Sequence, residues 1–182
     1  MNLDHIPSAW IGHRGFAGWL VKHMQPRVTV DLGVDYGYSS FALAEHNPGT
    51  VYGVDMFEGE RGATYGSTLA QAQAYCNELG LTNVKLIKGT FEHVAKTWTQ
   101  PVDILHIDGT HTTQAVTADY TIWAPHVREG GVILFHDTTA FPEVGRVVRQ
   151  LPGYIGEFRH SAGLGILCRD PELAKEIKGW LL

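Results

Sequence analysis

The sequence predicts an α/β fold in which helices cover both faces of a doubly wound, mostly parallel sheet of seven strands. Short β-branched apolar runs alternate with helical patterns along most of the 182 residues. Such alternation is typical of parallel strands joined by right-handed crossovers. The run GGVILFHD at 130–137 is apolar at successive positions, as expected for a strand buried on both faces. We therefore expect an open, mostly parallel sheet that ends in an antiparallel hairpin.

The individual elements follow from the same patterns. Five β-branched, apolar runs predict the parallel strands, at 27–32, 50–55, 84–88, 101–107 and 130–136. Helical patterns occupy the stretches around them, at 8–24, 38–46, 67–80, 91–97, 112–124 and 142–151. YIGEFRH and LGILCR flank SAGLG and predict two final strands in an antiparallel hairpin. We expect a single domain over 1–182, with 1–25 as an N-terminal helical addition.

Composition and charge argue against several classes of partner. The formal net charge is -5 and no cluster of Lys and Arg stands out, which argues against a nucleic-acid surface. Apolar runs fall short of membrane-spanning length, and MNLDHIPSAW lacks a charged-then-apolar export signal. The two cysteines, Cys76 and Cys168, are too few for a disulfide scaffold and lack the spacing of a metal site. We expect a cytoplasmic protein whose partner is a small molecule.

The segment VDLGVDYGYSS (30–40) reads as a strand that turns into a helix through a glycine-rich loop. Gly33 and Gly37 are separated by three residues, so the dinucleotide fingerprint G-x-G-x-x-G is absent. Asp31 and Asp35 flank Gly33 and would repel a pyrophosphate at a helix N-terminus. A ligand that carries an ammonium and a sulfonium but no phosphate suits the loop better, and S-adenosylmethionine is such a ligand.

VDLGVDYGYSS resembles motif I of the class I S-adenosylmethionine-dependent methyltransferases, acid-x-Gly-x-x-x-Gly, often followed by Ser. The resemblance continues through VYGVD, KGTFEHV and ILHIDGTHTTQAVTADYTIWAPHVREGGVILFHD. It points to a small bacterial branch that includes macrocin-type O-methyltransferases and cephalosporin-hydroxylase-like proteins. It implies a Rossmann-like methyltransferase fold, with Asp55 as the ligand of both ribose hydroxyls. The cofactor-binding residues that it implies are Asp31, Gly33, Asp35, Gly37, Ser39, Asp55, Met56, Thr90, Phe91 and Asp108.

Asp108 and Asp137 follow the predicted fourth and fifth strands and should face the same crevice. Neighbouring carboxylates repel each other unless a cation or a shared proton relieves them. Catechol-type O-methyltransferases, which this region also resembles, hold Mg²⁺ at matching positions. The resemblance therefore implies a metal site at Asp108, His136 and Asp137. His136 stands where the catechol-type pattern has an acid, and imidazole is a poorer magnesium ligand, so Mg²⁺ and other divalent metals both stay open.

His111 lies three residues after Asp108, at the offset where catechol-type enzymes place a lysine base. We expect His111 and Asp108 to be catalytic, because a histidine base has a pKa near operating pH. A helix-capping role for His111 stays open. His106 shares a strand face with Asp108 and is expected to be a buried histidine with satisfied hydrogen bonds.

The predicted function is methyl transfer from S-adenosylmethionine to a small-molecule acceptor, with a hydroxyl oxygen favoured over nitrogen. Two alternatives stay open: a metal-dependent oxygenase on the same fold, because two histidines and a carboxylate can bind Fe(II), and a cofactor-binding protein without catalysis. The acceptor site is formed either by loops of this chain or with a second subunit in a homodimer. The glycine-rich loop 56–68 follows Asp55 and could close over the cofactor.

Overall fold

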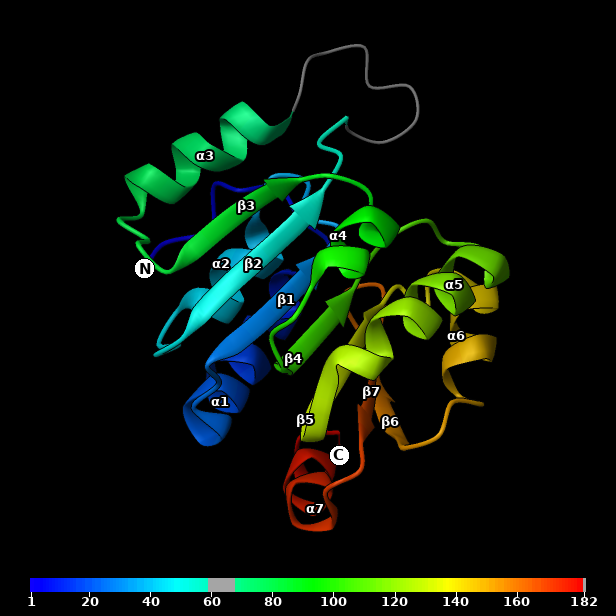
Figure 1. The fold of residues 1–182 in the computed structure, drawn as a ribbon. Helices are drawn as coiled ribbons and strands as arrows, with labels where there is room; N and C mark the ends of the chain where they lie inside the picture. The colour runs from blue at the N-terminus through cyan, green and yellow to red at the C-terminus, as the bar shows by residue number, and fades with distance from the viewer. Residues whose placement is uncertain (59–67, 182) are drawn as a thin grey trace.

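The computed structural model describes residues 1–58 and 68–181, which form one seven-stranded sheet with helices on both faces (Figure 1). Its strands are β1 (Val28–Leu32), β2 (Thr50–Asp55), β3 (Val84–Lys88), β4 (Val102–Ile107), β5 (Val127–His136), β6 (Tyr154–Phe158) and β7 (Leu164–Cys168). Its α-helices are α1 (Arg14–Met24), α2 (Tyr38–Ala44), α3 (Thr68–Glu78), α4 (Phe91–Thr97), α5 (Thr113–Trp123), α6 (Pro142–Val148) and α7 (Pro171–Trp180). Two short 3₁₀ turns are η1 (Ile11–His13) and η2 (Ala124–His126).

The strand order β3-β2-β1-β4-β5-β7-β6 confirms the predicted mostly parallel sheet and its antiparallel end. Strands β1 to β5 pair in parallel, and β7 is antiparallel to both β5 and β6. The order reverses between β1 and β4, because the chain first builds outward to β3 and then returns to the other side of β1. Ligands of open α/β sheets bind beyond the carboxyl ends of the strands at such a reversal.

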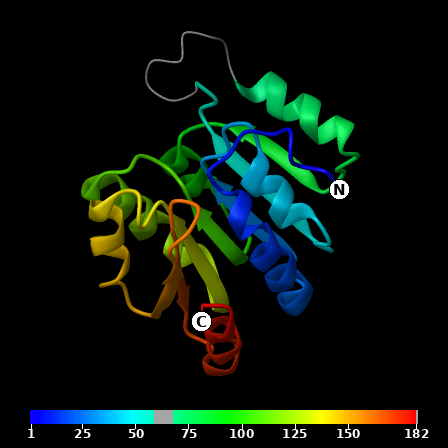
Figure 2. The same cartoon turned by 180° about the vertical axis from the view of Figure 1, so that it is seen from behind.

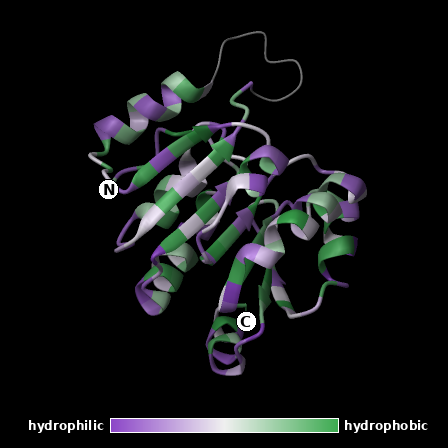
Figure 3. Cartoon of the chain, viewed as in Figure 1, coloured by the Kyte–Doolittle hydropathy of each residue, from purple (hydrophilic) through white to green (hydrophobic). Residues whose placement is uncertain are grey.

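Alternating side chains of the strands fill two hydrophobic layers. On β4, Ile104 belongs to the hydrophobic cluster that contains buried residues of α1, α2 and α7, whereas Leu105 belongs to the cluster with buried residues of α4, α5 and α6. Figure 2 shows the first of these helical layers from behind. Figure 3 shows hydrophobic positions recurring along the strands, with polar positions between them. Burial on both faces explains why the end of β5 reads as a continuous apolar run.

Most predicted elements are confirmed, and the differences lie at their ends. Strand β5 begins at Val127 instead of 130, because its ladder with β4 continues through an irregularity between Val102 and Ile104. The predicted helix 8–24 is α-helical only from Arg14, since the Ser8 hydroxyl accepts a bond from the Trp10 N–H and starts a turn. Helices 38–46 and 142–151 end earlier, at Ala44 and Val148. The start of helix 67–80 and most of the loop 56–68 lie outside the described residues.

Helix α7 is absent from the sequence prediction. Its start carries a recognisable signal, because the Asp170 carboxylate accepts bonds from the Glu172 and Leu173 N–H groups and Pro171 occupies the first turn. Leu173 and Ile177, four residues apart, are buried against the sheet. This spacing is that of an amphipathic helix.

Cys76 and Cys168 are both buried free thiols. No helix within the described part of the chain has the length and apolar character needed to cross a membrane.

Candidate active site

The glycine-rich loop after β1 packs directly against the end of β4. The Gly33 N–H donates to the Val54 carbonyl at 3.0 Å, and the Asp108 N–H donates to the Leu32 carbonyl at 2.8 Å. Gly33 has φ +95°, and a Cβ there would lie 1.7 Å from the Asp108 carbonyl oxygen. Glycine is therefore required both by the backbone conformation and by the close approach.

Asp55 ends β2 and holds this loop in place. One carboxylate oxygen accepts from the Val34 N–H at 2.8 Å and the Asp35 N–H at 2.9 Å. The other oxygen accepts from the Phe57 N–H at 2.7 Å. The structure thus brings Asp55 and the motif I loop together, as the resemblance implies, and Asp55 remains partly exposed.

Asp31 lies below the loop and not at its surface. Its side chain is 0% exposed, and Oδ2 accepts from the Ser39 hydroxyl at 2.7 Å and from the Ser40 hydroxyl. Oδ1 lies 2.6 Å from Nδ1 of His106. The carboxylate of Asp31 is thus enclosed by protein donors, and its predicted contact with the cofactor stays a prediction.

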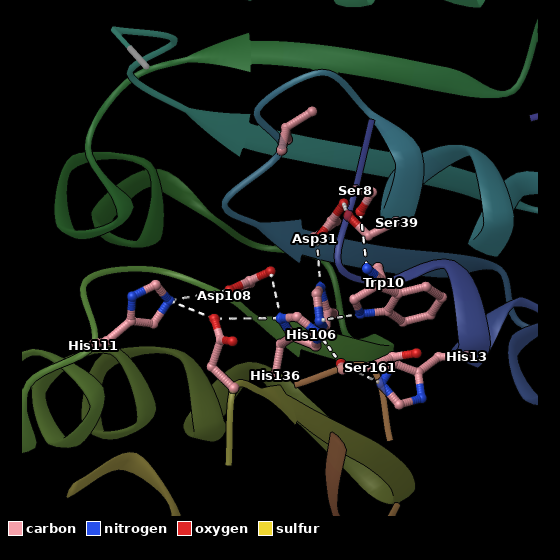
Figure 4. A network of polar contacts seen from close by, with 12 residues as sticks. Ser8, Trp10, His13, Asp31, Ser39, His106, Asp108, His111, His136 and Ser161 are labelled. Atoms are coloured by element: carbon pink, nitrogen blue, oxygen red, sulfur yellow. Dashed lines mark hydrogen bonds and ion pairs between the residues drawn. The ribbon is translucent and has the colours of Figure 1, made fainter. Parts of the chain in front are cut away.

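His106 is fully buried, and both of its ring nitrogens have partners, which confirms the prediction of a satisfied buried histidine. The Trp10 indole N–H donates to Nε2 at 3.0 Å. Since indole can only donate, Nε2 must be the accepting nitrogen and Nδ1 carries the proton toward Asp31. Figure 4 shows this chain of contacts from Trp10 through His106 to Asp31 and Ser39.

A second group of side chains meets at the ends of β4 and β5 (Figure 4). His111 Nε2 lies 2.6 Å from Asp137 Oδ2 and 3.5 Å from Asp108 Oδ1. His136 Nδ1 lies 3.2 Å from Asp108 Oδ2 and 3.4 Å from Asp137 Oδ2. One ligand atom each from Asp108, His111 and Asp137 all fall within 4.8 Å of one another. The structure therefore brings Asp108, His111, His136 and Asp137 together, as predicted.

The orientation of His136 is set by a backbone carbonyl. Its Nε2 lies 2.9 Å from the Ser161 carbonyl oxygen, which also receives the His13 ring at 3.1 Å. A carbonyl only accepts, so Nε2 of His136 carries a proton and Nδ1 faces the two carboxylates. Burial lowers the pKa of His13 to about 3, so this ring is neutral. Sequence reasoning missed His13 and Ser161, because neither belongs to a motif.

Charge coupling shifts the pKa of every member of this cluster. The carboxylates of Asp108 and Asp137 raise the pKa of His111 to about 9. For His136, burial opposes the charge, but the same carboxylates raise its pKa to about 10. Burial likewise opposes ionisation of the two acids, yet the adjacent imidazoles hold the pKa of both below the ordinary value. Two imidazolium rings thus balance two carboxylates at neutral pH.

The donor set also fits a divalent cation. His111 Nε2 and His136 Nδ1 are buried nitrogens that lack a partner with hydrogen-bond geometry, although carboxylate oxygens lie close by. These nitrogen and oxygen atoms point toward a common centre without a well-aligned hydrogen bond between them, as the ligands of a metal ion do. A histidine that binds a metal through one ring nitrogen is commonly oriented by a hydrogen bond from the other, as Nε2 of His136 makes to the Ser161 carbonyl.

The remaining predicted residues lie around these two groups. Met56 directly follows Asp55 and is partly buried. Thr90 is exposed, and its hydroxyl accepts from the His93 N–H at 3.1 Å as the N-cap of α4. The next residue, Phe91, is partly buried, and its ring would lie 2.7 Å from a Cβ at Gly109. A further aromatic that the sequence reasoning missed, Phe141, stacks on His111 with ring centroids 4.1 Å apart and is 40% exposed.

Comparisons with known proteins agree with this geometry. A family model described as a methyltransferase domain matches residues 30–138. The uncharacterized protein y4gI of Sinorhizobium fredii is 34% identical over 181 residues, which cover 92% of this chain and 20% of that protein. The chain thus spans about a fifth of the length of the curated relative it matches.

Solved structures share the fold. The O-methyltransferase TomG from Streptomyces achromogenes, involved in tomaymycin synthesis and solved with S-adenosylmethionine, has a TM-score of 0.67 and 18% identity; the match covers 86% of this chain and 79% of TomG. An O-methyltransferase from Bacillus cereus, solved with S-adenosylhomocysteine, has a TM-score of 0.67 and 15% identity over 87% of this chain and 81% of its own. The family model spans more than half of the sequence, and the motif I loop of this chain lies where the strand order reverses between β1 and β4. The chain therefore belongs to the class I S-adenosylmethionine-dependent methyltransferases.

Proposed function

We propose that the protein transfers the methyl group of S-adenosylmethionine to a hydroxyl oxygen of a small-molecule acceptor, assisted by a divalent cation. The observation that carries the proposal is the convergence of two carboxylates and two imidazole nitrogens at the ends of β4 and β5. This cluster adjoins the glycine-rich loop, since the backbone of Asp108 contacts Gly33. A methyl donor on the loop and an acceptor at the cluster would therefore be neighbours.

On the cofactor side, Asp55 is proposed to accept the ribose hydroxyls. Its oxygens already receive three backbone N–H groups, which hold the carboxylate in one orientation. Gly33 supplies the close backbone approach, and Ser39, in the first turn of α2, is proposed to face the cofactor. The methyl group is already activated, so most of the rate enhancement should come from proximity and alignment.

On the acceptor side, Asp108, Asp137 and His111 are proposed to hold the cation, with Nδ1 of His136 beside them. When bound, a divalent cation lowers the pKa of an acceptor hydroxyl and orients its oxygen. A ligating nitrogen has no lone pair left for a proton, so we propose His111 as a ligand in place of the general base expected from the sequence. Two imidazoles favour Mn²⁺, Fe²⁺ or Zn²⁺ over Mg²⁺.

Calorimetry separates the two halves of this proposal. The wild type should bind S-adenosylhomocysteine and, independently, Mn²⁺. Asp137→Asn should lose most of its Mn²⁺ affinity and keep its affinity for S-adenosylhomocysteine. The control Glu143→Gln changes an exposed carboxylate on α6 and should bind Mn²⁺ as the wild type does. Wild-type Mn²⁺ affinity in Asp137→Asn would remove the cation site from the proposal.

Turnover tests the reaction itself. Formation of S-adenosylhomocysteine should be followed with a panel of hydroxylated and aminated small molecules, with and without Mn²⁺. Cation-dependent turnover with hydroxylated acceptors is expected. Turnover confined to amines would overturn the choice of oxygen, and an iron- and oxygen-dependent product without methyl transfer would favour the oxygenase alternative.

A further inference from the structure

We propose that His13, the last residue of η1, is a positioning residue for the cation site. Its Nε2–H holds the Ser161 carbonyl, and this carbonyl in turn holds the ring of His136 with Nδ1 toward the carboxylates. His13 itself would touch neither the cation nor the acceptor. The inference rests on the proposed cation site and concerns how one of its histidines is kept in place.

The carbonyl oxygen of Ser161 is shared by two buried imidazole rings. It lies 3.1 Å from Nε2 of His13 and 2.9 Å from Nε2 of His136. The two rings are edge to face with centroids 5.7 Å apart, and both meet Ser161 (Figure 4). A carbonyl oxygen has two lone pairs, so it can accept from both rings at once. The position of this oxygen therefore depends on His13 as well as on His136.

Ser161 lies at the tip of the β6–β7 hairpin in a conformation that the chain does not favour by itself. Its φ is 49° and that of Ala162 is 66°, both in the left-handed region that L-residues seldom occupy. Contacts from other segments hold this tip. The Thr139 and Ala140 N–H groups, just after β5, both donate to the Ala162 carbonyl at 3.0 Å. A conformation of this kind persists only where the surrounding structure determines it.

The N-terminal turn holds the tip through Ser161. The Gly12 N–H donates to the Ser161 hydroxyl at 3.2 Å. A Cβ at Gly12 would lie 2.3 Å from that hydroxyl oxygen and 2.8 Å from Nδ1 of His160, so the two segments approach closely. Gly12 and His13, adjacent in sequence, thus bind the hydroxyl and the carbonyl of the same serine.

The surroundings of His13 indicate why a histidine occupies this position. Its ring is 0% exposed and lies beside the rings of Trp10, Phe158 and His160. Nδ1 is buried and has no hydrogen-bond partner among the described residues. A buried polar atom without a partner is unfavourable, and phenylalanine would fill the same space without that cost. Within the described structure, the contact that requires a histidine is the one from Nε2–H to Ser161.

Loss of the His13 N–H would release the Ser161 carbonyl. The tip could then relax out of the left-handed region, and the carbonyl would turn away from His136. The ring of His136 could rotate about its Cβ–Cγ bond, which would carry Nδ1 away from Oδ2 of Asp108, 3.2 Å from it in this structure. A cation at this site would lose a well-placed nitrogen.

Calorimetry with Mn²⁺ and three variants tests the proposal. His13→Phe keeps a buried aromatic ring and removes the N–H, so the Mn²⁺ affinity should fall about tenfold, the lower end of the effect of losing a contact that orients a metal-bound histidine. His13→Gln retains an N–H donor and should keep most of that affinity. The control His23→Phe changes an exposed histidine on α1 and should bind Mn²⁺ as the wild type does. Wild-type affinity in His13→Phe, or an equal loss in His13→Gln, would overturn the proposal.

The affinity for S-adenosylhomocysteine separates positioning from folding. It should be the same in His13→Phe and in the wild type, because the glycine-rich loop is unchanged. A role of His13 in folding alone would weaken the binding of both ligands together, which would overturn the proposal. Failure of the wild type to bind Mn²⁺ would instead refute the cation site on which the inference rests.

Proton exchange in the metal-free protein, followed by nitrogen NMR, gives a second readout. The Nε2 proton of His136 is bonded to a buried carbonyl, so it should exchange slowly with solvent in the wild type. Exchange should be faster in His13→Phe and slow in His13→Gln, while the backbone amides of β4 exchange alike in all three proteins. The same exchange rate of this proton in His13→Phe and the wild type would overturn the proposal.

Discussion

Replacing Gly33 with alanine should destabilise the protein by about 2–5 kcal/mol. Alanine in the left-handed region costs roughly 1–2 kcal/mol, and φ at Gly33 is +95°. Forcing a methyl group into filled space adds about 1–3 kcal/mol. The new Cβ would lie 1.7 Å from the Asp108 carbonyl oxygen and 2.6 Å from its carbon, and this backbone group is held in place because the Asp108 N–H is bonded to the Leu32 carbonyl. The upper half of the range is therefore expected.

Urea unfolding followed by circular dichroism measures this difference, and a thermal midpoint lowered by roughly 4–20 °C should accompany it. Gly18→Ala is the matched control. Gly18 lies inside α1 with no atom within 4 Å of an added Cβ, so alanine should stabilise the helix by about 0.5–1 kcal/mol. A Gly33→Ala variant within about 0.5 kcal/mol of the wild type, the range of neutral surface changes, would refute the close approach between β1 and β4.

Three further predictions concern the site and the pH dependence of stability. His111→Ala removes a proposed cation ligand, so it should lower turnover by about a hundredfold or more and leave the affinity for S-adenosylhomocysteine unchanged in calorimetry; an unaltered rate would remove His111 from the chemistry. Asp55→Ala should weaken that affinity about tenfold or more, and normal binding would contradict the ribose assignment. Burial raises the pKa of Asp119 to about 6, with no ionic or hydrogen-bond partner among the described residues. Ionisation is thus costlier in the folded state, and the unfolding free energy should fall as pH rises from about 4 to 6. Measured by urea unfolding at several pH values, Asp119→Asn should show a smaller decrease in unfolding free energy between about pH 4 and 6 than the wild type. The same pH dependence in both proteins would contradict a raised pKa of Asp119.

The strands were predictable because burial on both faces leaves a local signature of continuous apolar residues. Strand β4 illustrates this, since all six of its residues are buried and the observed Val102–Ile107 agrees with the predicted run 101–107 to within one residue. Helix α7 was not predicted although Asp170 and Pro171 mark its start, because its sequence is mostly polar and only two of its residues, Leu173 and Ile177, are buried.

The site was predictable only where topology brings residues together. Asp108 and Asp137 follow adjacent parallel strands, so their proximity follows from the fold class. Trp10 and His106 are 96 residues apart, and His13 and Ser161 are 148 apart. Such contacts depend on how an N-terminal segment and a hairpin tip pack over the sheet, which no local pattern encodes. For the same reason the motif could not reveal that Asp31 is enclosed by protein donors.

The position of β7 between β5 and β6 has a consequence for the order in which the protein is built during translation. Strand β5 leaves the ribosome before its neighbour β7, so one edge of β5 keeps unpaired N–H and C=O groups while residues 137–163 are being added. His136 also lacks its carbonyl partner until Ser161 has been synthesised. A nascent chain that stops before the hairpin therefore exposes a strand edge prone to mispairing and lacks part of the candidate site, so release of a truncated product should yield aggregated protein.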